Sequence, residues 1–178
     1  MNIKVLEKTK GCMPQIFKQG EWIDLVTAED YRLNAPQANK MHIRSTGKNP
    51  SQELRTRDVD FHYWILRLGV AMQIPDGYEA IVAPRSSTFK KYGLMQTNSI
   101  GVIDGSYCGE GDEWGMPVVA TRAVTVPKGT RVAQFRIQLS QKATFLQKIK
   151  WLFSSGVRIQ QVDHLGNPDR KGFGSTGN

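Results

Sequence analysis

The C-terminal residues 172–177 carry groups that could hold a phosphate and cover a flat ring. Their glycines let the backbone wrap a ligand, and the hydroxyls of Ser175 and Thr176 stand next to main-chain N–H groups that can bind an anion. Phe173 is the one aromatic residue among them. A tail of this composition is also typical of simple disorder. The prediction of a phosphate-binding flap therefore depends on internal segments suited to the same ligand.

An arginine-serine segment follows a predicted strand at residues 83–87. We expect an exposed loop here, in which Arg85 supplies a guanidinium group while Ser86 and Ser87 supply hydroxyls and successive N–H groups. Arginine is suited to bidentate binding of phosphate, and hydroxyls can donate to phosphate oxygens. An ordinary serine-containing turn without a ligand is the alternative for this segment taken by itself.

Residues 98–107 predict a hairpin with Asp104 and Gly105 near its turn. The unpaired edge of such a hairpin can hydrogen-bond a base through its backbone, and the amide of Asn98 could add to that recognition. Asp104 is then placed to accept a proton from water, and Tyr107 to stack against a sugar. A plain Asp-Gly turn is the common alternative.

Two more polar residues lie within apolar runs. Asp24 occurs in residues 20–25, where a carboxylate needs an arginine, a metal-bound water or a backbone donor as its partner. Gln134 is on the strand face opposite Ala133 and Phe135, which a polar face directed at solvent explains equally well.

Short strands must position these residues. Every second residue from Leu66 to Ile74 is apolar, which predicts one half-buried strand. The turn at residues 75–77 should lead back to a partner strand at residues 78–83. Further strands are expected at residues 100–103, 118–126 and 133–139. Short strands with turns at this spacing are typical of an all-β sandwich or jelly roll.

One amphipathic helix, at about residues 142–153, interrupts the strands. Lysines lie among the apolar residues of its predicted face, which are Phe145, Leu146, Ile149, Leu152 and Phe153. We expect this helix to pack against its own sheet or a neighbouring subunit. A basic helix of this kind can alternatively lie on a membrane.

Length and composition favour one domain. With 178 residues, 39% of them hydrophobic, the chain can bury a core without disulfides. We expect a single domain over residues 1–165 and a flexible C-terminal arm over residues 166–178. Cys12 and Cys108 fit no metal-ligand or redox spacing, and the sequence has no membrane-spanning run or leader, so we expect a cytoplasmic protein that does not associate with a membrane.

The formal net charge of +8 implies an anionic partner, for which a polyphosphate metabolite and nucleic acid are both candidates. The basic residues are spread along the chain without a nucleic-acid-binding motif, so we expect no nucleic acid partner. Residues 40–57 are the most basic region, and we expect an exposed loop there that could touch a partner.

Five segments, in this order, resemble the motifs of the trimeric dUTPase family: residues 23–25, 84–87, 101–107, 131–134 and 172–177. The resemblance implies a jelly-roll or distorted β-barrel subunit of a homotrimer, whose C-terminal arm closes over a neighbour's active site. It also implies hydrolysis of dUTP to dUMP and pyrophosphate with Mg²⁺, which limits uracil in DNA and supplies dUMP for dTTP synthesis.

The same resemblance implies roles for individual residues. Asp104 would orient and deprotonate the water that attacks the α-phosphorus. Asp24 would reach Mg²⁺ through a water, and the triphosphate would supply the inner ligands. The residues implied to read uracil or to pack under the deoxyribose are Asn98, Gly101, Val102, Ile103 and Tyr107.

The phosphates and the attacking water would be held by Arg85, Ser86, Ser87 and Gln134. Phe173 would stack on uracil, and the β- and γ-phosphates would be bound by Gly174, Ser175 and Thr176. The family's arginine five places before this phenylalanine is replaced by Pro168, so Arg170 is the nearest substitute for it.

Other departures from the family pattern suggest a phage-like or divergent branch. Trp22 stands where a small residue is usual, so the local packing must differ, and residues 111–114 form an acidic insertion. This insertion, the 40–57 region and the helix could bind a regulatory protein. Two alternative functions follow. One is a dCTP deaminase or bifunctional deaminase, which would need a catalytic glutamate in the hairpin region, where this chain has Asp104 followed by Gly-Ser-Tyr. The other is a non-catalytic regulator with the same fold.

Overall fold

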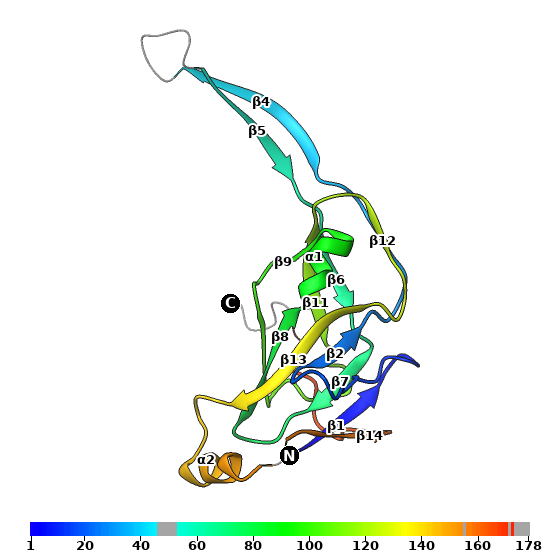
Figure 1. The fold of residues 1–178 in the computed structure, drawn as a ribbon, viewed down its shortest axis with the longest axis vertical. Coiled ribbons are helices and arrows are strands. Elements are labelled where there is room, and N and C mark those ends of the chain that lie inside the picture. Colours follow the sequence, from blue (N-terminus) through cyan, green and yellow to red (C-terminus); the bar gives the residue numbers. More distant parts are fainter. Residues whose placement is uncertain (46–52, 155, 171, 173–178) are drawn as a thin grey trace.

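The computed structural model of the chain describes residues 1–45, 53–154, 156–170 and 172. Figure 1 shows a β-rich body, a long two-stranded ribbon that projects from one end of it, and a short helix at the other end. The prediction of an all-β fold is therefore confirmed. None of the helices in these ranges is long and apolar enough to span a membrane.

The body is built from three sheets and a small additional strand pair. The largest sheet has the order β10-β8-β13-β2, formed by Gly101–Asp104, Tyr78–Pro84, Arg131–Leu139 and Ile23–Val26. A second has the order β14-β1-β7, formed by Arg158–Val162, Asn2–Glu7 and Val70–Gln73. The third has the order β6-β11-β9, formed by Tyr63–Arg67, Gly115–Ala120 and Leu94–Gln96. The extra pair is β12 with β3, Val124–Val126 and Tyr31–Leu33.

The inward faces of the sheets enclose an apolar core. Trp114 and Phe135 are buried within it with their ring centroids 5.2 Å apart, in the edge-to-face arrangement that aromatic pairs favour. Phe135 and Ile137 point inward from β13, which leaves Gln134 on the opposite face. The period-two pattern in the sequence therefore predicted correctly which side chains of this strand face the core.

The prediction of a single strand from Leu66 to Ile74 is wrong, because the backbone bends at Gly69, between two separate strands. This residue has a φ of +68°, and a Cβ atom there would lie 2.6 Å from the Cys12 sulfur. Its N–H donates to Glu113 Oε1 at 3.0 Å, which holds the bend. The alternating apolar residues are all buried as predicted, but Leu66 belongs to β6 and Val70 and Met72 belong to β7 in a different sheet, while Leu68 and Ile74 lie outside both strands.

The predicted pairing across the turn at residues 75–77 is also wrong. The turn itself forms, with the Tyr78 N–H donating to the Pro75 carbonyl at 3.2 Å. Strand β8 then pairs with β10 and β13, whereas β7 pairs with β1. Strand 118–126 likewise separates into β11 and β12. The local sequence pattern predicts where a strand lies but not which strand pairs with it, because pairing depends on segments distant in sequence.

The exposed loop predicted for residues 40–57 is instead a ribbon. Strands β4 (Gln37–Ser45) and β5 (Glu53–Asp60) are antiparallel, with a register shift between Ala38 and Met41. The ribbon extends away from the body (Figure 1), and Met41 and Val59 are exposed. The sequence of these two strands lacks apolar alternation, and this explains why they were not predicted as strands.

The predicted helix is confirmed as α2, Phe145–Leu152. Thr144 caps it: its hydroxyl accepts from the Gln147 N–H, while the Gln147 side chain accepts from the Thr144 N–H, an arrangement known as a capping box. The face that contacts the body is not the apolar one, however. The side chains of Gln147 and Trp151 contact the body, through the Asp76 carbonyl at 2.9 Å and the Tyr78 ring at 5.6 Å between centroids.

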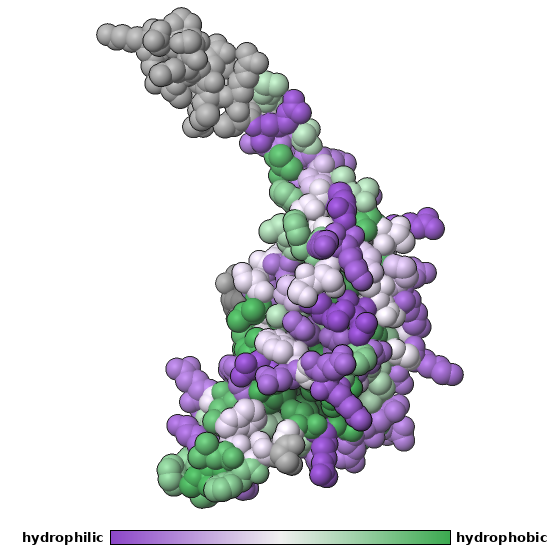
Figure 2. All heavy atoms as spheres, in the orientation of Figure 1, coloured by the Kyte–Doolittle hydropathy of each residue, from purple (hydrophilic) through white to green (hydrophobic). Residues whose placement is uncertain are grey.

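The apolar residues of the predicted face are exposed in the single chain, so their packing against a neighbouring subunit stays a prediction. Phe145, Leu146, Leu152 and Phe153 are exposed, and they form the green patch on the helix in Figure 2. The periodicity indicated correctly that these residues share a face, but the face opposite to it anchors the helix.

Candidate functional site

The first group of predicted site residues surrounds Asp24 on strand β2. This side chain is only 5% exposed and forms ion pairs with Arg85, Nε to Oδ1 at 3.0 Å, and with Arg131, Nη1 to Oδ2 at 3.3 Å. Gln134 is the direct strand neighbour of Asp24 on β13. Of the partners expected for a carboxylate in this apolar run, the structure therefore supplies arginines, and sequence reasoning missed the contribution of Arg131.

This group lines a cleft of about 340 Å³. Its walls include Phe17, Trp22, Asp24, Arg85, Arg131 and Gln134. The Arg131 guanidinium carbon lies 4.9 Å from the centre of the Phe17 ring, a cation–π contact that fixes the side chain over the cleft. The lining carries two guanidinium groups and two carboxylates, those of Asp24 and Glu21, so its formal charges balance, and the guanidinium N–H groups that do not face Asp24 are suited to an anion.

Arg85 is positioned by the start of helix α1, Ser86–Tyr92, rather than by the loop that the sequence predicted. The buried Thr88 hydroxyl donates to the Val132 carbonyl at 2.7 Å and ties the first turn to β13. Gly93 ends the helix with a φ of +65°. Thr88 is the only buried residue of this helix, so the sequence has no apolar period from which the helix could be predicted. Ser86 and Ser87 lie in its first turn, beside Arg85.

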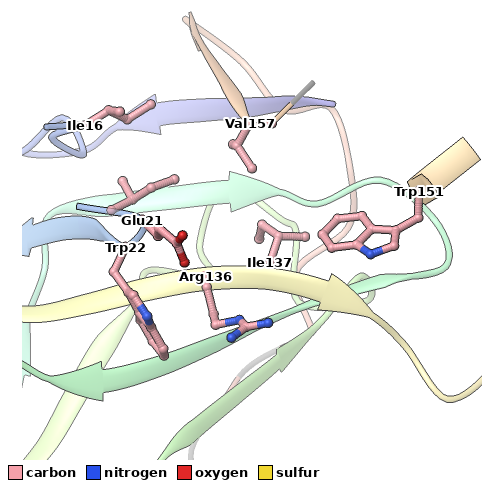
Figure 3. Close-up of a pocket in the computed structure, with 9 residues that line it drawn as sticks. Ile16, Glu21, Trp22, Arg136, Ile137, Trp151 and Val157 are labelled. Atoms are coloured by element: carbon pink, nitrogen blue, oxygen red, sulfur yellow. The ribbon is translucent and has the colours of Figure 1, made fainter. Parts of the chain in front are cut away.

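Trp22, the unusual residue of the first motif, lies at a second cavity of about 290 Å³. The Arg136 guanidinium lies over its ring at 5.9 Å from the centroid. Figure 3 shows Trp22 and Arg136 toward one end of this cavity and Trp151 of α2 at the other, with Ile137 between them. The local packing that the sequence predicted to differ is thus the contact of Trp22 with Arg136 on the surface of β13.

The second group centres on Asp104, at the end of strand β10. Its Oδ1 accepts from the Ser106 N–H at 2.9 Å and from the Ser106 hydroxyl at 2.5 Å. Arg170 Nη1 donates to both carboxylate oxygens, at 2.9 and 2.8 Å. The same nitrogen donates to the Ser106 oxygen at 2.9 Å, so Ser106 is a further site residue that the motifs did not identify.

These contacts control the ionisation of Asp104. Partial burial raises the pKa of its carboxyl, but the hydrogen bonds from Ser106 and the charge of Arg170 outweigh burial, so its pKa lies below the ordinary value. Asp104 is therefore a carboxylate at neutral pH. A carboxylate held in one orientation can accept a proton from a water placed against it.

The hairpin predicted at residues 98–107 is wrong in its pairing. Strand β10 pairs with β8, and within the described residues it has no neighbour on its other side. The chain turns before β10, at Ser99 with a φ of 60°, and the Asn98 side chain accepts from Gln96 Nε2 at 2.8 Å. The expected open edge is nevertheless present, with Val102 exposed beside it.

Tyr107 lies directly beyond Asp104 and is fixed by its hydroxyl, which donates to the Glu113 carbonyl at 2.9 Å. Gly172 lies against its ring, where an added Cβ atom would come within 2.8 Å. Tyr107, Asp104 and Arg170 are thus brought together in one chain. The predicted flap residues Phe173, Gly174, Ser175 and Thr176 lie outside the described residues.

The two groups lie far apart within one chain. In the strand register, Asp104 of β10 lies opposite Glu79 of β8. Asp24 of β2 lies opposite Gln134 of β13, and Gln134 in turn lies opposite Ala83 of β8. Three strand spacings across the sheet and four residues along it correspond to about 20 Å. A single small ligand atom cannot contact both groups of one chain.

No group of three or more His, Cys, Asp or Glu side chains in the described ranges is arranged to hold a metal ion. Both oxygens of Asp24 face guanidinium groups. This donor set fits a Mg²⁺ ion whose inner ligands are mainly phosphate oxygens and waters, because Mg²⁺ is commonly bound in this way with few protein carboxylates.

The strand arrangement resembles that of solved dUTPases. It superimposes on dUTPase from Streptococcus mutans with a TM-score of 0.59 at 18% identity, over 81% of this chain and 99% of that one. It also superimposes on the Staphylococcus bacteriophage 80alpha dUTPase, solved with dUPNHPP, with a TM-score of 0.55 at 18% identity, over 99% of this chain and 98% of that one. At these identities, the likeness establishes the fold.

The sequence itself establishes the family. The dUTPase family model matches residues 56–151, which include Arg85, Asp104 and Gln134. The chain is 38% identical to the SPbeta prophage-derived deoxyuridine 5'-triphosphate nucleotidohydrolase YosS of Bacillus subtilis, over 99% of this chain and 97% of that protein. The deoxyuridine 5'-triphosphate nucleotidohydrolase of Thermobifida fusca is 34% identical over 63% of this chain and 56% of its own length. The chain belongs to the dUTPase family.

Proposed function

We propose that this protein hydrolyses dUTP to dUMP and pyrophosphate by attack of a water molecule on the α-phosphorus. The observation that carries the proposal is Asp104, an ionised carboxylate held at the end of an open strand edge in a chain of the dUTPase family. In-line displacement at a polyphosphate depends on positioning and charge neutralisation more than on covalent chemistry. The two groups of residues are suited to these tasks.

Asp104 orients the attacking water and accepts its proton. The open edge of β10 reads uracil through the backbone of Gly101, Val102 and Ile103, with Asn98 adding its amide. Tyr107 packs under the deoxyribose, where a 2′-hydroxyl would collide with it. The support for this arrangement is that the edge, the carboxylate and the ring lie in sequence along one short segment.

The cleft around Asp24 binds the phosphates. Arg85 and the first turn of α1, with Ser86 and Ser87, contact phosphate oxygens, and Gln134 holds the attacking water or an adjacent oxygen. Mg²⁺, when bound, neutralises charge on the triphosphate, and Asp24 contacts one of its waters. Arg170 contributes a further charge toward the phosphates. Phe173 covers uracil, while the β- and γ-phosphates are bound by Gly174, Ser175 and Thr176.

The separation of about 20 Å between the two groups implies that a working site combines chains. A threefold homotrimer satisfies this need: one chain supplies Asp104 and the uracil-reading edge, and a neighbour supplies the phosphate cleft around Asp24. The C-terminal arm completes the site. Removal of dUTP in this way would limit uracil in DNA and supply dUMP for dTTP synthesis.

The test is release of pyrophosphate from dUTP, dTTP, dCTP and UTP with Mg²⁺, with ammonia monitored in parallel. We expect pyrophosphate from dUTP alone. The Asp104→Asn variant should lose activity by about 10²- to 10⁴-fold while still binding dUTP, because it removes the proton acceptor but keeps the shape. Asp163→Asn makes the same chemical change at an exposed carboxylate and should retain activity. Ammonia from dCTP would show a deaminase instead, and a silent wild-type protein would favour a regulatory role.

A further inference from the structure

The acidic insertion after Tyr107 contacts a distant part of the chain. Residues 108–113, here called the acidic loop, lie against residues 165–170, here called the arm root. Leu165 is buried, and its N–H donates to Glu110 Oε1 at 3.3 Å. The Asn167 side chain donates to the Cys108 carbonyl at 3.4 Å. The start of the C-terminal arm is thus attached along its length to the loop that follows Asp104.

Asp112 is the centre of this attachment. Its side chain is only 1% exposed, the lowest value for any acidic or basic residue in the described part of the chain. One oxygen accepts from the Gly109 N–H at 2.9 Å, and both oxygens accept from the Arg170 N–H, at 3.0 and 2.9 Å. Burial of a carboxylate is costly unless such donors are supplied, so the position of the Arg170 main chain is tied to this charge.

Asp169 closes the contact from the opposite direction. Its Oδ1 accepts from the Gly111 N–H at 2.6 Å. A Cβ atom on either Gly109 or Gly111 would collide with Asp169, so the two glycines are needed for this close approach. The loop and the root therefore exchange carboxylate-to-backbone hydrogen bonds: Asp112 of the loop accepts from the root, and Asp169 of the root accepts from the loop.

Fixing the Arg170 backbone brings its side chain to Asp104. With its N–H on Asp112, the guanidinium reaches both oxygens of Asp104 and the Ser106 hydroxyl. Gly172 then lies against the ring of Tyr107. We propose that Asp112 is a positioning residue for dUTP hydrolysis, which docks the arm root on the chain that carries Asp104 and so fixes where Arg170 and the following substrate-binding arm begin.

This inference rests on the proposed function, and kinetics can test it through the coupling between Asp112 and the arm. Asp112→Asn is compared in the full chain and in a chain ending at residue 169, which lacks Arg170 and the arm that follows it. In the full chain we expect KM for dUTP to rise about tenfold, since a charged acceptor of the Arg170 N–H is lost. In the shortened chain the same substitution should change kcat/KM less than twofold, because the residues that it positions are gone. Equal losses in both chains would show a merely structural role and overturn the proposal.

A second measurement does not depend on activity. Trypsin cleavage after Arg170, followed by mass spectrometry of the native protein, reports release of the arm root. Asp112→Asn should accelerate this cleavage about tenfold, and Asp163→Asn should leave it unchanged. Asp169→Ala releases the same root without altering the hydrogen bond from Gly109 to Asp112, and it replaces Asp112→Asn if that variant does not fold. Cleavage at the wild-type rate in a folded variant would overturn the proposal, whereas absence of dUTP hydrolysis by the wild-type protein would overturn only the proposed function.

Discussion

Asp104 shows how neighbouring groups prepare one side chain for chemistry. Burial alone would favour its protonated form, and Ser106 and Arg170 reverse that preference. Sequence reasoning identified Asp104 from its motif but not these supporting contacts, because Arg170 is 66 residues away. The same holds for Asp24, whose need for a partner was predicted while Arg131 was not. Residue type indicates the chemistry, and the fold determines the partners.

We predict that Arg170→Gln raises the pH at which activity is lost in acid. The Asp104 pKa lies below its ordinary value, so the carboxylate is present above that pKa and is lost as the pH falls through it. Without the guanidinium, the pKa should rise, and the acid limb of kcat/KM for dUTP should move to higher pH. Arg158→Gln, at an exposed arginine on β14, serves as the control and should leave the limb in place. An unchanged limb in Arg170→Gln would remove Arg170 from the control of Asp104.

At the scale of elements, the sequence predicted the half-buried strands well and the others poorly. β8 and β13 carry alternating apolar residues because one face of each meets the core, and their positions were predicted closely. The β4–β5 ribbon and helix α1 bury almost nothing among their described side chains, so they have no apolar period to detect. Helix α2 was predicted from its period, yet the apolar face that the period marks is not the face that contacts the body of the chain.

The anchoring of α2 by its less apolar face leads to a prediction on stability. Trp151 is partly buried against Tyr78, whereas Leu152 next to it is 78% exposed. Trp151→Ala should lower the free energy of unfolding by about 2 kcal/mol, and Leu152→Ala should change it by less than about 0.5 kcal/mol. Chemical denaturation of both variants measures the difference. Equal effects would mean that the apolar face of α2 is covered in the folded protein.

For the whole molecule, the important feature is the distance between the two halves of the site. All five motifs could be identified in the sequence, but motif order does not reveal that Asp104 and Asp24 lie on opposite edge strands of the same sheet. That placement results from β8 and β13 lying between β10 and β2. One chain of this topology therefore cannot bring Asp104 and Asp24 into contact with the same small ligand.

A mixing experiment tests this arrangement. Asp104→Asn and Arg85→Ala should each inactivate the protein, because each removes one half of every site. If the two variants are unfolded together and refolded as mixed trimers, about one quarter of the sites should regain both intact halves. Activity near 25% of wild type is therefore expected, compared with almost none when the variants are mixed without refolding. Failure of the refolded mixture to recover activity, while each variant alone refolds as a trimer, would place both halves in one chain.

The parallel pairing of β14 with β1 has a consequence for how the protein is made. The two strands pair from Asn2 with Arg158 to Leu6 with Val162, so β1 cannot complete its pairing until β14 has been synthesised. Strand β7 can cover one edge of β1 earlier in translation, but the other edge stays open until β14 is available. Folding of this sheet is therefore completed only after β14 has been made, and a nascent chain that stalls after β13 exposes an unpaired β1 edge to its neighbours on the polysome.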